Sequence, residues 1–178
     1  MIYRSHADLG GQDGHGVVRH ASEGEALHDE WERRVLALNL GLGATGLWNI
    51  DMSRAARETL EDYARLSYYQ IWLEGLEKLL LQSGAVHADE FAQGRQIDAA
   101  IPVARVLHAG EVAAALARGA PTLRPPSRSA RYAVGQWVRT CGIAPPHHTR
   151  LPAYARGKRG VIERIHGMHV ITPRLPRA

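Results

Sequence analysis

Residues 66–82 read Leu-Ser-Tyr-Tyr-Gln-Ile-Trp-Leu-Glu-Gly-Leu-Glu-Lys-Leu-Leu-Leu-Gln and form the clearest helical pattern in this chain of 178 residues. Apolar side chains recur every three or four positions, so a helix would present them on one face. Ser83-Gly84 follows directly and is typical of a helix end. The apolar positions are Leu66, Tyr69, Trp72, Leu73, Leu76, Leu79 and Leu80.

Shorter helices are expected on both sides of this one. The first begins near His28 and ends in the glycine-rich run at residues 41–46. The second reaches about Leu60, and Asp51 or Ser53 is the expected N-cap because short polar side chains accept hydrogen bonds from free backbone amides. The apolar stripe of the first is Trp31, Val35, Leu38 and Leu42, and two further helices are expected at residues 88–93 and 110–118.

The pattern changes from helix to strand after residue 120. A stretch rich in Pro, Ser and Arg reads as a linker, and short β-prone runs bounded by Gly and Pro follow it. These runs are typical of a small SH3-like barrel, but the chain ends at Ala178, so we expect an apparently shortened barrel. The expected strands cover residues 132–134, 137–140 and 160–165.

The fold class that follows is α+β, with four parts. The glycine-rich run at residues 8–16 lacks the Lys-Ser/Thr of a phosphate loop, so we expect an extended arm that lies against a partner, where glycine permits close approach. The expected parts are an N-terminal extended arm at 1–27, a helical domain at 28–120, a linker at 121–130 and a partial SH3-like barrel domain at 131–178.

Charge is divided unevenly between the two ends of the chain. Residues 1–117 carry a net charge of −7, whereas residues 118–178 carry +11 with Glu163 as their single acid. Such a basic end suits a nucleic acid, an acidic protein surface or an anionic catalytic centre. The single cysteine, Cys141, excludes a cysteine-rich metal site in this chain and favours a reducing compartment. Neither a signal peptide nor a membrane-spanning run is evident, so a cytoplasmic location is expected.

Two groups of residues resemble a zinc site and a nucleic-acid-binding surface, but the sequence pattern does not favour either interpretation. The pairs His147-His148 and His166-x-x-His169 resemble zinc spacings, yet they lack the glutamate of a metalloprotease, so loop or packing histidines are the preferred interpretation. In the basic segment 124–164 the aromatic residues could stack on bases or fill a small barrel core. These aromatic residues are Tyr132, Trp137 and Tyr154.

Five short motifs follow one another along nearly the whole chain. They are Asp-Leu-Gly-Gly-Gln-Asp-Gly-His-Gly at 8–16, Glu-Trp-Glu at 30–32, Tyr-Tyr-x-x-Trp-Leu at 68–73, Trp-Val-Arg at 137–139 and His-Thr-Arg-Leu-Pro-Ala-Tyr-Ala-Arg-Gly at 148–157. In this order and near these spacings, they resemble the beta subunit of nitrile hydratases, a family related to the small subunits of thiocyanate hydrolase. His147 stands where the family usually has glycine.

The resemblance implies a lyase that works only as a heteromer. Nitrile hydratases convert nitriles to amides at a Co(III) or Fe(III) ion, which the partner alpha subunit holds with a cysteine cluster that includes oxidised cysteines. The chain would then bind no cofactor itself and would be inactive alone. Its partner would be an alpha subunit, in a heterodimer or heterotetramer, with the nitrile at the interface.

The resemblance also assigns roles to individual residues. Arg54 and Arg150 match the arginines that hydrogen-bond the oxidised cysteines, and a guanidinium fork suits a sulfinate as it suits a carboxylate. Tyr68 matches a tyrosine at the substrate pocket, and Trp48 and Tyr69 match its walls. Alternatives are an accessory protein of the same family that aids metal loading, a subunit of a thiocyanate hydrolase-like enzyme and, less favoured, a nucleic-acid-binding barrel module.

Overall fold

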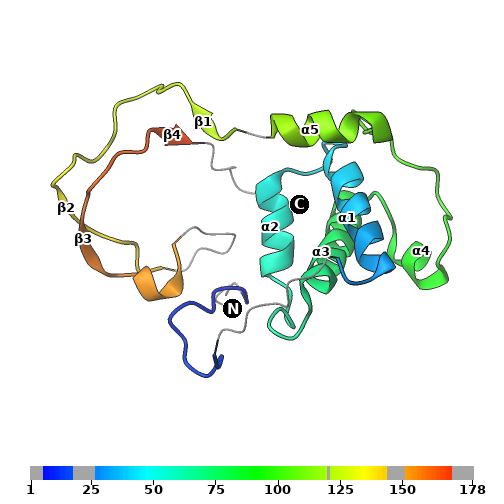
Figure 1. The fold of residues 1–178 in the computed structure, drawn as a ribbon, viewed down its shortest axis with the longest axis horizontal. Coiled ribbons are helices and arrows are strands. Elements are labelled where there is room, and N and C mark those ends of the chain that lie inside the picture. The colour runs from blue at the N-terminus through cyan, green and yellow to red at the C-terminus, as the bar shows by residue number, and fades with distance from the viewer. Residues whose placement is uncertain (1–5, 18–26, 120, 144–150, 170–178) are drawn as a thin grey trace.

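The computed structural model describes residues 6–17, 27–119, 121–143 and 151–169. Within these residues the chain is α+β, with helices in its earlier part and short strands toward its end (Figure 1). The helices are α1 (Glu30–Gly43), α2 (Ile50–Glu58), α3 (Tyr68–Ser83), α4 (Ala88–Gln93), the 3-10 turn η1 (Ala109–Glu111), α5 (Val112–Arg118) and the 3-10 turn η2 (Ala153–Ala155). The strands are β1 (Leu123–Arg124), β2 (Trp137–Arg139), β3 (Arg159–Val161) and β4 (Met168–His169).

Helix α3 is the centre of the helical part, because both α1 and α2 pack against it. Its start is fixed by a capping box in which Ser67 and Gln70 bond each other's backbone amides. Its end is fixed by Gly84, whose φ of 68° lies in the left-handed region that glycine favours. The observed bounds differ from the expected residues 66–82 by two residues at most.

Helix α2 begins earlier than its predicted caps allow. Asn49 is the N-cap, and its side-chain oxygen accepts hydrogen bonds from the amides of Asp51 and Met52, both at 3.0 Å. The prediction of Asp51 or Ser53 as the cap is therefore wrong. Asparagine is as good an N-cap as aspartate or serine, and Asp51 instead places its charge in the positive first turn.

A small core lies where α2 and α3 meet. Its buried members are Trp48, Ala56, Leu76 and Leu79. The predicted stripe of α1 is only partly covered: Val35 is 3% exposed, whereas Leu38 is 50% exposed. Among the described residues, no helix is both long enough and apolar enough to cross a bilayer.

The close approach of α2 to α3 depends on Gly75. A Cβ built on Gly75 would overlap Cγ of Arg57 and would lie 3.5 Å from its Cα. Any larger side chain at this position would therefore push the two helices apart or displace Arg57. The Arg57 side chain occupies the space that Gly75 leaves open.

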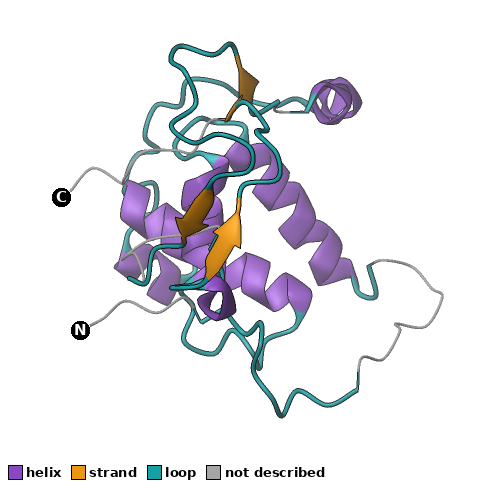
Figure 2. Ribbon diagram, turned by 90° about the vertical axis from the view of Figure 1, so that its left-hand side faces the viewer, coloured by secondary structure: helices purple, strands orange, loops and turns teal. Residues whose placement is uncertain are grey.

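The strands form two antiparallel pairs. Strand β1 pairs with β4, and β2 pairs with β3 in the register Trp137 with Val161 and Arg139 with Arg159. Figure 2 views them from the strand side, with the helices behind. The described residues do not close into a barrel.

One strand prediction for this part is wrong. The expected strand at 132–134 is a turn, in which the Gln136 amide donates to the Ala133 carbonyl at 3.1 Å. Strand β1 lies within the expected linker.

Candidate functional site

Two of the residues selected by the resemblance lie at the α2–α3 junction. Arg54 lies on α2 with its side chain 37% exposed, and its Nη1 is 3.5 Å from Asp51 Oδ1. Tyr68 is the first residue of α3 and is 64% exposed. A half-buried arginine and an exposed tyrosine, on two packed helices, can both face a partner surface.

Tyr68 belongs to an aromatic group at the start of α3. Its ring centroid is 5.2 Å from that of Tyr69, in an edge-to-face arrangement, and 5.6 Å from that of Trp72. Tyr69 and Trp72 are 6.2 Å apart. Because these distances fall in the favourable range for aromatic pairs, the group holds Tyr68 in place although the ring is exposed.

Arg57 is a member of this site that the sequence did not single out. Its guanidinium carbon is 4.6 Å from the Trp72 ring centroid, and its Nε and Nη2 donate to the backbone oxygen and Oγ of Ser53, both at 3.1 Å. Burial lowers the pKa of Arg57, nearby Tyr68 opposes this change and nearby Arg54 adds to it. Arginine remains charged under all ordinary conditions, so Arg57 is a fixed cation near both Arg54 and Tyr68.

We call Arg54, Arg57, Tyr68 and Tyr69 the arginine face. A signal for Arg57 was available, because it follows Arg54 by three positions and therefore lies on the same side of α2. Trp48 does not join this face, since it is 8% exposed and packs in the helical core. Arg150 lies outside the described residues, as do His147 and His148.

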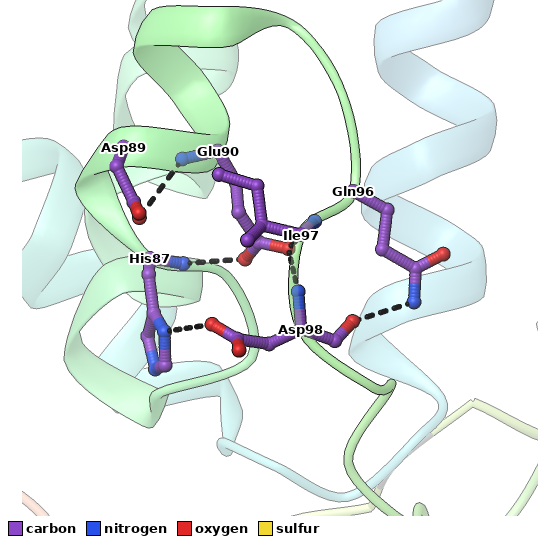
Figure 3. Close-up of polar contacts among 6 residues, drawn as sticks. All are labelled: His87, Asp89, Glu90, Gln96, Ile97 and Asp98. Carbon is purple, nitrogen blue, oxygen red and sulfur yellow. Dashed lines mark hydrogen bonds and ion pairs between the residues drawn. The ribbon is translucent and has the colours of Figure 1, made fainter.

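A second polar group, the α4 cluster, consists of His87, Glu90 and Asp98 (Figure 3). Glu90 accepts hydrogen bonds from three backbone amides, those of His87 at 2.9 Å, Ile97 at 2.8 Å and Asp98 at 3.2 Å. His87 Nδ1 lies 2.8 Å from Asp98 Oδ2. Together these contacts fold the segment after α4 back onto the start of that helix.

The α4 cluster has ligand atoms within 4.8 Å of one another, a spacing that a metal ion could bridge. Closure of the loop accounts for the same contacts, since Glu90 already caps α4 and binds the returning segment. The cluster borders a pocket of about 510 Å³ whose apolar lining includes Leu80, Phe91 and Ile101. The arginine face takes no part in that pocket.

His169, one of the histidines considered for zinc, is exposed and makes local hydrogen bonds. Its Nδ1 lies 3.1 Å from Thr122 Oγ1, and its Nε2 lies 3.1 Å from the carbonyl oxygen of His166. Both ring nitrogens are therefore engaged beside the β1–β4 pair.

Replacing Asp98 by Asn is expected to lower the pKa of His87. The hydrogen bond to the Asp98 carboxylate is the main reason that this pKa is raised, and the charge of Asp98 adds to it. The pKa of His87 is higher in the folded chain than in the unfolded chain. The His87–Asp98 pair therefore stabilises the fold fully at pH values below the pKa of His87 in the unfolded chain. This stabilisation is lost as the pH rises through the pKa of His87 in the folded chain. NMR titration of the His87 ring measures the shift directly.

Asp89→Asn provides the matched control, because Asp89 is the weakest contributor to the raised pKa of His87. We expect a much smaller change from it than from Asp98→Asn. Equal changes in the two variants would contradict the hydrogen-bonded geometry of the α4 cluster.

Comparison with known proteins identifies the family. Residues 4–117 match the family model described as nitrile hydratase beta subunit, N-terminal, and residues 121–175 match the corresponding C-terminal model. The chain belongs to the nitrile hydratase beta subunit family.

Individual relatives agree with this assignment. The chain is 30% identical over 172 residues to the low-molecular-weight cobalt-containing nitrile hydratase subunit beta of Rhodococcus rhodochrous, covering 92% of this chain and 76% of the relative. It is 33% identical over 155 residues to a nitrile hydratase subunit beta of Pseudomonas putida, covering 86% and 70%. It is 24% identical over 172 residues to a cobalt-containing subunit beta of Pseudonocardia thermophila, covering 92% and 74%.

Proposed function

We propose that this chain is the beta-type subunit of a nitrile hydratase and completes the active site on a metal-bearing alpha subunit. The observation that carries the proposal is the arginine face. It presents an exposed tyrosine and two neighbouring arginines in a chain that matches the beta family over both of its parts. The reaction is the addition of water to a nitrile, which gives an amide.

Each residue of the arginine face has a distinct task in this proposal. Arg54, together with Arg150, donates hydrogen bonds to the oxygens of the oxidised cysteines of the alpha subunit and fixes their orientation. Arg57 lies beneath, held by Ser53 and Trp72, and adds a fixed positive charge. The exposed Tyr68 hydroxyl donates to the substrate or its attacking water at the interface, and Tyr69 supports the Tyr68 ring.

The metal belongs to the partner in this proposal. Cys141 is the single cysteine of the chain, so this subunit has no cysteine cluster to offer, whereas its guanidinium groups suit an anionic sulfinate. The Co(III) or Fe(III) ion supplies Lewis-acid polarisation of the nitrile or activation of water. Cys141 is a free, exposed thiol, and this supports a reducing, cytoplasmic setting.

Exposed apolar residues of the strand part support a subunit role. Trp137 is 72% exposed, and Val134 and Ile143 are 63% and 78% exposed. Exposed large apolar side chains on a strand pair are candidates for contact with a partner. We propose that the two strand pairs are the open part of an SH3-like barrel that lies against the alpha subunit.

Reconstitution with the cognate alpha subunit tests the function. We expect amide formation from a simple nitrile only in the mixture, and neither subunit alone should form the amide. Arg54→Lys should lower kcat in the mixture by about 10- to 100-fold, as is usual for groups that orient metal ligands. Arg95→Lys is the control, because Arg95 lies on the helical part away from the arginine face and pairs with Gln93.

The same experiment separates the alternatives. An accessory protein would raise activity while the metal is being loaded, and the mature enzyme would keep its activity after the chain is removed. A thiocyanate hydrolase-like subunit would give turnover of thiocyanate instead of nitrile. Stable co-purification of the mixture without hydration of any nitrile would overturn the proposed function.

A further inference from the structure

Ala7 and Asp8 of the N-terminal arm join two parts of the chain. The Ala7 amide donates to the carbonyl of Glu58, the last residue of α2, at 3.4 Å. The Asp8 carboxylate accepts from the Ala153 amide with both oxygens at 3.0 Å, and from Arg156 Nη2 at 2.9 Å. Neighbouring residues of the arm thus hold the end of α2 on one side and the turn at 151–156 on the other.

The Asp8–Arg156 ion pair is shielded from solvent. Its side chains are 11% and 15% exposed, whereas those of the ion pair between Arg65 and Asp62 are 86% and 66% exposed. Arg156 Nη2 also donates to the Leu151 carbonyl at 3.2 Å, so the same guanidinium closes the turn. A shielded pair of this kind holds its geometry well, and removing one partner leaves an uncompensated charge.

Two glycines of the arm, Gly10 and Gly11, fit closely against the same turn. A Cβ added to Gly10 would lie 2.9 Å from Cε1 of Tyr154, and one added to Gly11 would lie 2.8 Å from Cβ of Tyr154. Gly11 also has a φ of 75°, which other residues rarely adopt. Gly10 and Gly11 therefore serve contact with this chain's own turn, in addition to any partner that the arm was expected to meet.

The principal contacts between secondary-structure elements in the described residues join helix to helix or strand to strand. The arm therefore provides a link of a different kind, from α2 to η2. Helix α2 carries Arg54, and the turn at 151–156 follows Arg150 directly in the sequence.

We propose that the N-terminal arm is an intramolecular clamp in which Asp8 is a positioning residue that holds α2 and the turn at 151–156 at a fixed spacing. The purpose of this fixed spacing, to let Arg54 and Arg150 reach the same cysteine cluster of the alpha subunit, rests on the proposed function. The clamp itself does not.

Spin labels on the full chain test the clamp. Cys141 is the single native cysteine and is exposed, and Gln82→Cys adds a second exposed label at the end of α3. Pulsed electron paramagnetic resonance should give one narrow distribution of distances between the two labels in the otherwise native chain. Asp8→Ala should broaden or shift it, and Asp8→Asn should do so less, since an amide oxygen still accepts from Ala153.

Asp13→Ala is the matched control, because Asp13 is an exposed aspartate of the same arm. It should leave the distribution unchanged. Circular dichroism distinguishes loss of the clamp from unfolding, because the helices should survive in Asp8→Ala. An Asp8→Ala distribution that overlays the native one would overturn the clamp.

Kinetics of the assembled enzyme test the positioning role. Asp8→Ala should lower kcat on the order of 10-fold with KM for the nitrile unchanged, since small misplacements of reacting groups slow chemistry more than binding. Asp8→Asn should restore part of the loss. An altered distance distribution with native kcat would overturn the positioning role. If the native mixture does not hydrate nitriles, the proposed function fails while the distance measurement still decides the clamp.

Discussion

Arg150→Lys is expected to lower kcat of the assembled enzyme by about 10- to 100-fold, the usual cost of losing a group that orients metal ligands. Lysine keeps the positive charge but replaces the planar fork by a compact ammonium, so it lacks two parallel donors at the fixed spacing that matches the two oxygens of a sulfinate. The expectation rests on the His-Thr-Arg-Leu-Pro motif at 148–152, because Arg150 lies outside the described residues.

The measurement compares steady-state amide formation by native and Arg150→Lys mixtures with equal metal content. Arg164→Lys is the matched control, since Arg164 belongs to the same basic end of the chain and is exposed. A non-specific effect of replacing arginine by lysine in this basic end, or a loss of folding, would lower turnover in both variants alike. Native turnover in Arg150→Lys would contradict the role assigned to this arginine.

The strongest periodicity predicted helix α3 to within two residues at each end. Helix α3 was predictable because seven apolar positions repeat at helical spacing and Ser83-Gly84 ends the run. The cap of α2 was not, because Asn49, Asp51 and Ser53 are all suitable and only packing chooses among them. Strands β1 and β4 span two residues each, too few for an alternating pattern to be recognised.

The candidate site was predictable only in part. Periodicity alone did not distinguish Arg54 or Tyr68 from ordinary surface and packing residues, so the family motifs had to select them. Arg57 was missed because its importance depends on a neighbour in space, the gap that Gly75 leaves on α3. Asp98 likewise joins His87 from eleven positions away, and no local motif connects them.

Gly75→Ala is expected to destabilise the chain by about 1–2 kcal/mol, although alanine favours helices over glycine by about 1 kcal/mol. The new Cβ would overlap Cγ of Arg57. Because Cγ lies close to the backbone, Arg57 can yield only by giving up its bonds to Ser53 or its place over Trp72. The free energy of unfolding in urea measures the effect.

Gly41→Ala in α1 is the matched control, because a Cβ there meets nothing within 4 Å. It should stabilise the chain by up to about 1 kcal/mol, the opposite sign. A stabilising Gly75→Ala would mean that α2 and α3 are not in close contact at this point.

The double variant identifies the cause. Arg57→Ala removes Cγ, so Gly75→Ala in that background should gain the helix preference of alanine without a clash. We therefore expect the two substitutions to be non-additive by about 0.5–3 kcal/mol, as is usual for residues in contact. Additive effects would mean that the destabilisation by Gly75→Ala does not arise from contact with the Arg57 side chain. Since Arg57 is also part of the arginine face, the size of this coupling measures how firmly the packing of α2 on α3 holds that cation in place.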